Sequence, residues 1–333
     1  MENEKILEIK DLHTGFRFQD KYFDAVDGVS FSLYKNELLA IVGESGCGKS
    51  TIANSIVGLH DKNNTRVSGE IIYNGKNVVN YSEDQFNEIR GKEIGFIFQD
   101  PLASLNPLHK VGKQIEESLI YHTDLDKQQR HERMLELLDK VGIVNPERTA
   151  NQFPHQLSGG MRQRVLIAIA LSCKPNIIIA DEPTTALDVT IQAQILDLLT
   201  ELQNEINAGI ILITHDLGVV AQMADRVAVM YAGQFVEVAD AKELFSNPLH
   251  PYTRSLLYSI PQSDAVGAEL HVIKGMVPSL KNLKREGCRF APRISWIPES
   301  EHEENPVLHE VSKNHFVRCS CWKNFHFEDE GSC

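Results

Sequence analysis

The sequence predicts an α/β fold built on a largely parallel sheet, and three observations support this prediction. Short apolar runs alternate with segments of helical periodicity, as in chains that build a sheet covered by helices. The runs at 177–180 and 210–213 are uninterrupted and rich in β-branched residues, which is typical of central strands buried on both faces. The chain has 333 residues, enough for one large domain and one smaller one.

The remaining elements follow in chain order. Two further apolar runs, at 38–42 and 94–98, are expected to form strands. The chain between 98 and 177 is polar and favours helix, and 127–141 carries apolar residues at helical spacing. We therefore expect an inserted helical subdomain at about 100–165. From about Pro278 onward the chain is rich in Pro, Arg, Glu, His and Cys without periodicity, so we expect a tail of low order.

Composition limits the possible functions. The chain has 33 Lys and Arg against 46 Asp and Glu, a net charge of −13, which argues against a nucleic-acid partner because phosphate backbones require a basic face. No apolar stretch approaches the roughly 18 residues of a membrane-spanning helix. The N-terminus lacks the pattern of a secretory signal, so we expect a cytoplasmic protein whose six cysteines are unpaired thiols.

A glycine-rich segment matches the phosphate-binding pattern G-x-x-x-x-G-K-[ST]. Its glycines allow successive N–H groups to point at phosphate oxygens, and the following helix adds its positive N-terminal end. Lys49 is expected to contact the β- and γ-phosphates, and the hydroxyl of Ser50 to bind Mg²⁺. The alternative is a turn that binds nothing, but the apolar strand before it and the helix after it favour nucleotide binding. The predicted binding residues are Gly43, Ser45, Gly46, Cys47, Gly48, Lys49, Ser50 and Thr51.

Polar groups suited to nucleotide hydrolysis follow the other apolar runs. Ligands of open parallel sheets bind at the carboxyl ends of the strands, so these groups are expected to converge. Asp181 is expected to hold Mg²⁺, Glu182 to act as general base, Gln99 to reach the metal and the attacking water, and His215 to contact the γ-phosphate. Taken singly, a carboxylate after a strand is often a helix cap and a lone histidine is usually solvated, but their joint occurrence favours a hydrolytic site.

Two further segments carry a family resemblance. The sequence LSGGMRQR at 157–164 resembles the LSGGQ signature of ABC ATPases, with Met161 in place of the usual Gln, and DEPTTALD at 181–188 resembles their Walker B strand and D-loop. Gln99 and His215 match the Q-loop and the switch histidine of the family. The resemblance covers about 1–240 and implies a P-loop NTPase of ABC type with a mixed sheet core, an inserted helical subdomain and a C-terminal extension.

The resemblance also implies how the site is completed. Ser158, Gly159 and Gly160 would face the γ-phosphate of ATP bound on another subunit, with Asp188 in the D-loop, so that a head-to-tail dimer encloses two ATP molecules with Mg²⁺. Ser158 also reads as a simple helix N-cap, and both interpretations hold together. An aromatic residue commonly stacks on adenine in this family. Tyr22 is the candidate, and Phe23 and Phe16 are its rivals; each could equally be a core residue.

More specific matches indicate the branch of the family. The segments 99–107, 247–254, 273–278 and 287–290 resemble oligopeptide and dipeptide importers. They imply a nucleotide-binding domain at 1–247, a C-terminal extension at 248–333, and an ATPase that powers peptide import. Nickel importers belong to the same group and remain an alternative. A non-transport ABC ATPase would usually have two cassettes or a long coiled coil, and a non-hydrolysing regulatory module would not need Glu182.

The partners follow from the same resemblance. The segment 153–164 resembles one of two paired ATPase types, which implies a heterodimer with a second ABC ATPase. Two transmembrane permease subunits and, indirectly, an external peptide-binding protein would complete the transporter. The chain would then lie peripherally on the cytoplasmic face of the cell membrane. Peptide length and sequence preference would be determined by the other subunits.

The cysteines of the tail suggest a comparison with relatives that hold an iron–sulfur cluster. Their four cysteines begin with the pattern G-C-x-F-x-x-R-C, but here Ile294 replaces the second cysteine after Cys288. Cys319 resembles the last ligand, and Cys321 or the terminal Cys333 could in principle substitute for the missing ones. His315 with Cys319 and Cys321 could instead form part of a zinc site. We expect neither a cluster nor zinc, but free thiols in an extension that packs or docks.

Overall fold

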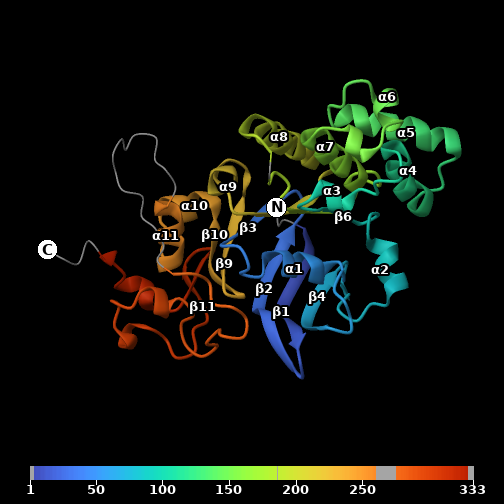
Figure 1. The fold of residues 1–333 in the computed structure, drawn as a ribbon. Coiled ribbons are helices and arrows are strands. Elements are labelled where there is room, and N and C mark those ends of the chain that lie inside the picture. The colour runs from blue at the N-terminus through green and yellow to red at the C-terminus, as the bar shows by residue number, and fades with distance from the viewer. Residues whose placement is uncertain (1–3, 186, 260–274, 329–333) are drawn as a thin grey trace.

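A computed structural model describes residues 4–185, 187–259 and 275–328 of the chain. Figure 1 shows two sheets at the centre, a group of helices on one side and the C-terminal extension on the other. The two sheets are built from different parts of the chain, and the helices cover the outer face of the larger one.

The large sheet is mixed, in agreement with the expected fold class. Its strand order is β11-β12-β10-β9-β3-β8-β7-β6. The five strands from β9 to β6 are parallel, and β10, β12 and β11 are added antiparallel at one edge. All four predicted strands form within it. The strands of this sheet are β3 (Leu38–Val42), β6 (Ile94–Ile97), β7 (Ile177–Asp181), β8 (Gly209–Thr214), β9 (Arg226–Tyr231), β10 (Gln234–Asp240), β11 (Leu308–Ser312) and β12 (His315–Arg318).

The small sheet is antiparallel, with the order β2-β1-β4-β5. It packs on one face of the large sheet through a core that includes alternate residues of β3 and the apolar face of helix α1 (Lys49–Ile56). Side chains alternate in direction along a strand, so the other residues of β3 face the second core beneath the helices. The strands are β1 (Lys5–Phe18), β2 (Lys21–Tyr34), β4 (Thr65–Tyr73) and β5 (Lys76–Asn77).

The helices between β6 and β7 form the group at the upper right of Figure 1. Helix α5 begins where Asp126 and Gln129 form a capping box, and it buries Met134, Leu137 and Leu138, the periodic residues that predicted it. The helices between β6 and β7 are α3 (Pro101–Ser104), α4 (Val111–His122), α5 (Lys127–Lys140), α6 (Pro146–Ala150) and α7 (Gly159–Ala170). The helices elsewhere in the chain, besides α1, are α2 (Glu83–Ile89), α8 (Val189–Ile206), α9 (Leu217–Met223), α10 (Ala241–Ser246) and α11 (Pro251–Tyr258).

The expectation of a tail of low order is wrong for residues 275–328. This part of the extension contains two strands and short 3-10 helices, η2 (Ala291–Arg293), η3 (Glu299–Glu301) and η4 (Cys321–Lys323). Phe290, Ile294 and Ile297 are buried in the main core. Elements of three to five residues are too short to produce a periodic pattern, so the sequence did not reveal them.

A buried carboxylate joins the extension to the sheet. Glu237 on β10 is fully buried. It accepts hydrogen bonds from the backbone N–H groups of Leu249 (2.8 Å) and His250 (2.9 Å), just before α11. The Nε2 atom of His315 on β12 lies 2.7 Å from the same carboxylate. Buried charges require such partners, so Glu237 links β10, α11 and β12 into one unit.

Candidate functional site

The predicted phosphate loop connects β3 to α1. Gly48 precedes the first turn of α1 with φ 111°, and a Cβ atom there would lie 2.5 Å from the carbonyl oxygen of Ala25. Gly43 has φ 152°, and its Cβ would lie 2.2 Å from the carbonyl oxygen of Met230. Both positions therefore require glycine, because side chains are disfavoured at these backbone angles and would also collide with neighbouring backbone. The loop is held in shape by its packing against these two segments.

The side chains of the loop divide into buried and exposed sets. Lys49 is buried, and its ammonium group donates to the carbonyl oxygens of Gly43 (2.8 Å) and Glu44 (3.1 Å). Cys47 is also buried, and burial raises the pKa of its thiol, so it packs as a neutral group. Ser45, Gly46 and Ser50 are exposed. The exposed residues and the N-terminus of α1 thus present a surface to which an anion can bind.

The polar residues predicted at the strand ends do converge. The amide of Gln99, after β6, donates to Glu182 Oε2 (2.8 Å), and Thr185 Oγ1 donates to the same oxygen (2.9 Å). His215, after β8, has its Nδ1 3.5 Å from Glu182 Oε1. Ser50 donates from its hydroxyl to Asp181 Oδ1 (3.0 Å). The loop, the end of β7 and its two neighbouring strands therefore meet at one edge of the sheet.

The two adjacent carboxylates have different environments. Asp181 is the last residue of β7 and is 7% exposed. Burial raises the pKa of its carboxyl group, the hydrogen bond from Ser50 opposes this, and the charge of Glu182 adds to it. Glu182 has a φ of 46°, a conformation that costs a non-glycine residue about 1–3 kcal/mol and is frequent at functional sites. This turn directs Glu182 toward Gln99 and His215.

The signature segment lies elsewhere in the same chain. Ser158 caps α7, its hydroxyl accepting from the backbone N–H of Met161 (3.3 Å). A Cβ on Gly160 would approach Ile191 to 2.9 Å. Asp188 caps α8 by accepting from the Ile191 N–H (2.9 Å). Figure 1 shows α7 among the helices at the upper right and α1 beside the small sheet. The hydrogen bonds of the Ser158 and Asp188 side chains given above are made to the first turns of α7 and α8. Ala186 in this region lies outside the described residues.

The three candidate aromatic residues differ in packing. Tyr22 on β2 is 39% exposed, with the guanidinium of Arg66 5.3 Å from its ring centre. Phe16 packs edge-on against His60, and Phe23 packs edge-on against Phe18.

The structure adds residues that the sequence did not indicate. The carboxylate of Glu44, within the phosphate loop, forms two hydrogen bonds with the guanidinium of Arg293 (2.7 and 3.1 Å). The backbone N–H of Glu44 donates to the hydroxyl of Tyr252 (2.8 Å). These partners belong to the extension and lie more than 200 positions away in the sequence, so no local pattern could have predicted the contact. The extension therefore supports the phosphate loop directly.

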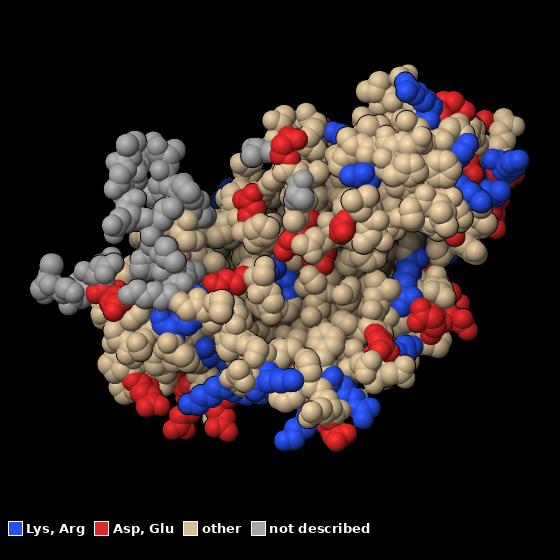
Figure 2. Space-filling model, viewed as in Figure 1, with Lys and Arg blue, Asp and Glu red and all other residues tan. Residues whose placement is uncertain are grey.

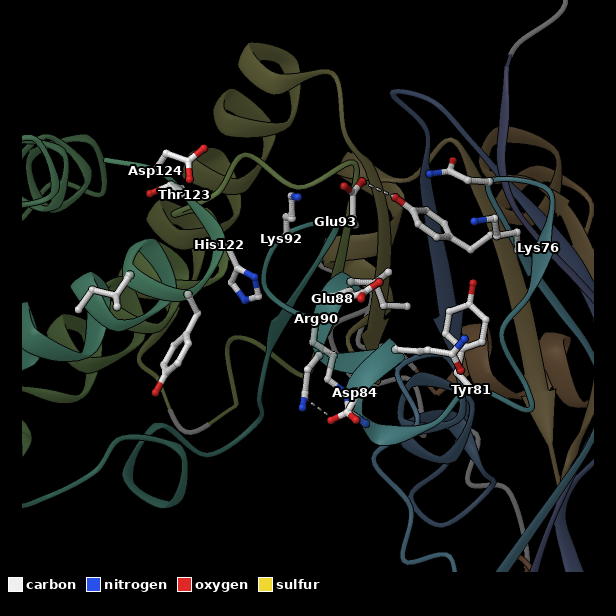
Figure 3. Close-up of a pocket in the computed structure, with 17 residues that line it drawn as sticks. Lys76, Tyr81, Asp84, Glu88, Arg90, Lys92, Glu93, His122, Thr123 and Asp124 are labelled. Atoms are coloured by element: carbon white, nitrogen blue, oxygen red, sulfur yellow. Dashed lines mark hydrogen bonds between the residues drawn. The ribbon is translucent and has the colours of Figure 1, made fainter. Parts of the chain in front are cut away.

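One hollow of the surface is lined by residues other than those of this site. It has a volume of about 1150 Å³ and lies between the region of α2 and the end of α4. Figure 3 shows Glu88 and Arg90 on one side, and His122 and Thr123 on the other. None of its lining residues is a predicted site residue. On the face drawn in Figure 2, basic and acidic side chains are interspersed and form no extended basic surface.

Comparison with known proteins agrees with this geometry. Residues 26–185 match the ABC transporter family, and residues 236–294 match the family described as the C-terminal region of oligopeptide/dipeptide transporters. Across the described residues, no helix is both long enough and apolar enough to cross a membrane. The match at 236–294 includes α11 and the contacts of Tyr252 and Arg293 with the phosphate loop.

Relatives and solved structures extend this agreement. The chain is 53% identical to the oligopeptide transport ATP-binding protein OppD of Lactococcus lactis, over 99% of this chain and 98% of the relative. It is 49% identical to the dipeptide transport ATP-binding protein DppD of the same species, over 96% and 91%. A dimer of the ATP-binding cassette MJ0796 bound to ADP and phosphate has a TM-score of 0.64 and 30% identity, over 71% of this chain and 99% of that one. The chain therefore belongs to the ATP-binding subunits of the oligopeptide and dipeptide ABC transporters.

Proposed function

We propose that the chain hydrolyses ATP to power the import of oligopeptides or dipeptides through a membrane ABC transporter. The convergence of Gln99, Glu182 and His215 beside the phosphate loop supports ATP hydrolysis. The names of the relatives support peptides as the cargo. The division into a nucleotide-binding domain at 1–247 and an extension at 248–333 is part of the proposal, and is consistent with α11 beginning at Pro251.

The roles of the residues follow from their positions. Lys49 and the exposed loop N–H groups bind the phosphates, with Ser45, Gly46, Cys47, Gly48 and Thr51 forming the rest of the cradle. Glu182 accepts the proton of the attacking water, which Gln99 orients, and His215 contacts the γ-phosphate. Ser50, Asp181 and Gln99 are the residues that would hold Mg²⁺, which supplies positive charge to the phosphates when bound. The hydrogen bond between Ser50 and Asp181 supports this pairing.

Half of each site comes from another subunit in this proposal. Ser158 and Asp188 cap α7 and α8, and in this proposal they act with Gly159 and Gly160 on ATP bound to a partner ATPase, as the family resemblance implies. The first turn of α7 then directs its N–H groups and the Ser158 hydroxyl at that ATP. Tyr22 is the proposed adenine contact, since it is exposed whereas Phe16 and Phe23 are partly buried and pack edge-on against other rings.

The assembly we propose is a heterodimer with a second ABC ATPase, on two permease subunits at the cytoplasmic face of the cell membrane. An external peptide-binding protein delivers the cargo. Pull-down of the tagged chain from solubilised membranes should recover a second, different ATPase together with two permeases. Recovery of copies of this chain alone would contradict the heterodimer.

Uptake measurements test the cargo. Cells lacking the chain should lose accumulation of a radiolabelled tripeptide, and the wild-type gene should restore it while Glu182→Gln should not. Nickel uptake is measured in the same cells. Loss and restoration of nickel uptake with unchanged peptide uptake would favour the nickel-importer alternative and contradict the proposed cargo.

A further inference from the structure

A compact group of metal-ligating side chains lies in the extension, away from the ATP site. The three sulfur atoms of Cys288, Cys319 and Cys321 and an imidazole nitrogen of His302 all lie within 4.8 Å of one another. Cys319 and Cys321 are buried, and Cys288 is partly buried. No other group of three cysteines with a histidine occurs among the described residues. Three thiols and an imidazole facing one another form a ligand set that soft or borderline metal ions prefer.

This arrangement differs from what the sequence suggested. His315 is not part of the group, because its imidazole pairs with the buried carboxylate of Glu237. His302, which follows η3, supplies the fourth ligand that was expected to be missing, with its Nδ1 4.0 Å from the sulfur of Cys319. Cys333 lies outside the described residues. The four ligands come from three separate segments, so their approach is a property of the tertiary structure.

The geometry fits a single ion better than an iron–sulfur cluster. Zinc–sulfur bonds of about 2.3 Å in a tetrahedron place sulfur atoms about 3.8 Å apart, and the four ligand atoms here, which all lie within 4.8 Å of one another, are compatible with that spacing. In a cluster the thiolates bind different irons and therefore lie farther apart. Ile294, at the position of the second cysteine in cluster-containing relatives, is 1% exposed and packs in the main core. The residues present do not fit a four-cysteine cluster.

The surroundings of the sulfurs suit a structural site. The backbone N–H of Glu303 donates to the sulfur of Cys319 (3.4 Å), a contact that orients a ligand and stabilises its thiolate. Cys319 has a φ of 69°, which turns the chain sharply between the end of β12 and η4. This conformation is unfavourable in energy for a non-glycine residue, and a metal bond to the same residue would offset that energy.

We propose that Cys288, His302, Cys319 and Cys321 bind one Zn²⁺ ion tetrahedrally as a structural site. The ion joins the loop before η2, the end of η3 and the segment after β12. Ion binding releases the remaining thiol protons to solvent. Because Phe290 and Arg293 follow Cys288 closely, the same ion supports the contact of Arg293 with the phosphate loop.

The test is metal analysis of the full chain, purified anaerobically from cells grown with both iron and zinc. We expect about one zinc per chain, with iron and acid-labile sulfide near zero. Cys321→Ser and His302→Ala should lose most of the zinc. Cys173→Ser is the matched control and should retain it, because Cys173 packs near Ser118 and Ser172, outside the group. Stoichiometric iron, with or without sulfide, or zinc retained in both ligand variants, would overturn the proposal.

A second measurement covers variants that fail to fold. The folded wild-type chain is treated with a thiol-reactive mercurial, and released zinc is measured with a chromogenic chelator. Cobalt substituted into the site should give intense visible absorption bands and a near-ultraviolet thiolate-to-cobalt band, as tetrahedral sulfur-rich sites do. Release of zinc at about one ion per chain and a cobalt spectrum of this form support the site. Absence of both would refute it.

Discussion

Replacing Arg293 by Ala is expected to weaken ATP binding without touching a residue proposed to bind ATP. The two hydrogen bonds between Arg293 and Glu44 span 2.7 and 3.1 Å. The Arg293 side chain is 6% exposed and that of Glu44 is 28% exposed. Removing one partner of a fully buried pair costs about 3–5 kcal/mol, whereas exposed pairs contribute about 0–1 kcal/mol. Because Glu44 can regain some water, we expect a loss of about 1–3 kcal/mol in the free energy of unfolding.

The effect on nucleotide affinity has two causes with the same sign. The phosphate loop loses a restraint, and Glu44 keeps a negative charge that no longer has its guanidinium partner, beside the position where a triphosphate binds. If about 1 kcal/mol of the loss appears in binding, the dissociation constant for ATP rises about fivefold. The part of this rise in the dissociation constant that comes from the unpaired charge of Glu44 should become smaller at higher salt, because salt screens the charge. Fluorescence titration with a labelled ATP analogue, together with thermal unfolding, measures both quantities.

Two further variants make this test specific. Arg285→Ala removes another guanidinium of the extension, one that pairs with Asp27 and does not contact the phosphate loop, and it should leave ATP affinity unchanged. Glu44→Gln combined with Arg293→Ala removes the unpaired charge and should recover part of the affinity. The reasoning is refuted if Arg293→Ala binds ATP as tightly as the wild type and unfolds at the same temperature.

Two other perturbations have a predicted direction. Burial lowers the pKa of His315, but the hydrogen bond and charge of Glu237 outweigh it and raise that pKa above its usual value. The contribution of the His315–Glu237 pair to the free energy of unfolding is therefore complete below the unfolded pKa of about 6.5. That contribution is lost as pH rises through the folded pKa. Thermal unfolding should show His315→Gln less stable than the wild type at pH about 6, and the difference in unfolding temperature should become smaller toward pH about 9. A difference that does not change with pH would contradict this. Gly43→Ala places a Cβ 2.2 Å from the Met230 carbonyl oxygen and should lower the unfolding temperature and abolish ATP binding; retention of both would contradict the packing argument.

The core of the fold was predictable because its signals are local. The runs that became β3, β6, β7 and β8 are apolar on both faces, so burial and strand formation leave the same pattern in the sequence. Polar residues after three of these runs could be placed together because parallel strands end at a common edge. That argument brought Gln99, Glu182 and His215 together, and the structure confirms their proximity.

The extension could not be predicted in the same way, because its structure depends on contacts between distant segments. His315 and Cys319 are close in sequence and looked like possible ligands of one ion, yet β12 directs His315 to Glu237 and leaves Cys319 beside His302. The pairing of Arg293 with Glu44 likewise joins residues at opposite ends of the chain. Neither arrangement leaves a periodic or motif-like trace in the sequence.

The most direct test of the proposed mechanism is the rate of ATP hydrolysis by the membrane-assembled transporter carrying Glu182→Gln. Glutamine keeps the size of the side chain but cannot accept the proton of the attacking water, and loss of a general base typically slows turnover by roughly 10²–10⁴-fold. We expect that loss together with unchanged ATP binding and accumulation of an ATP-bound dimer. Hydrolysis by the variant at the wild-type rate would contradict the role assigned to Glu182, and with it the catalytic site described here.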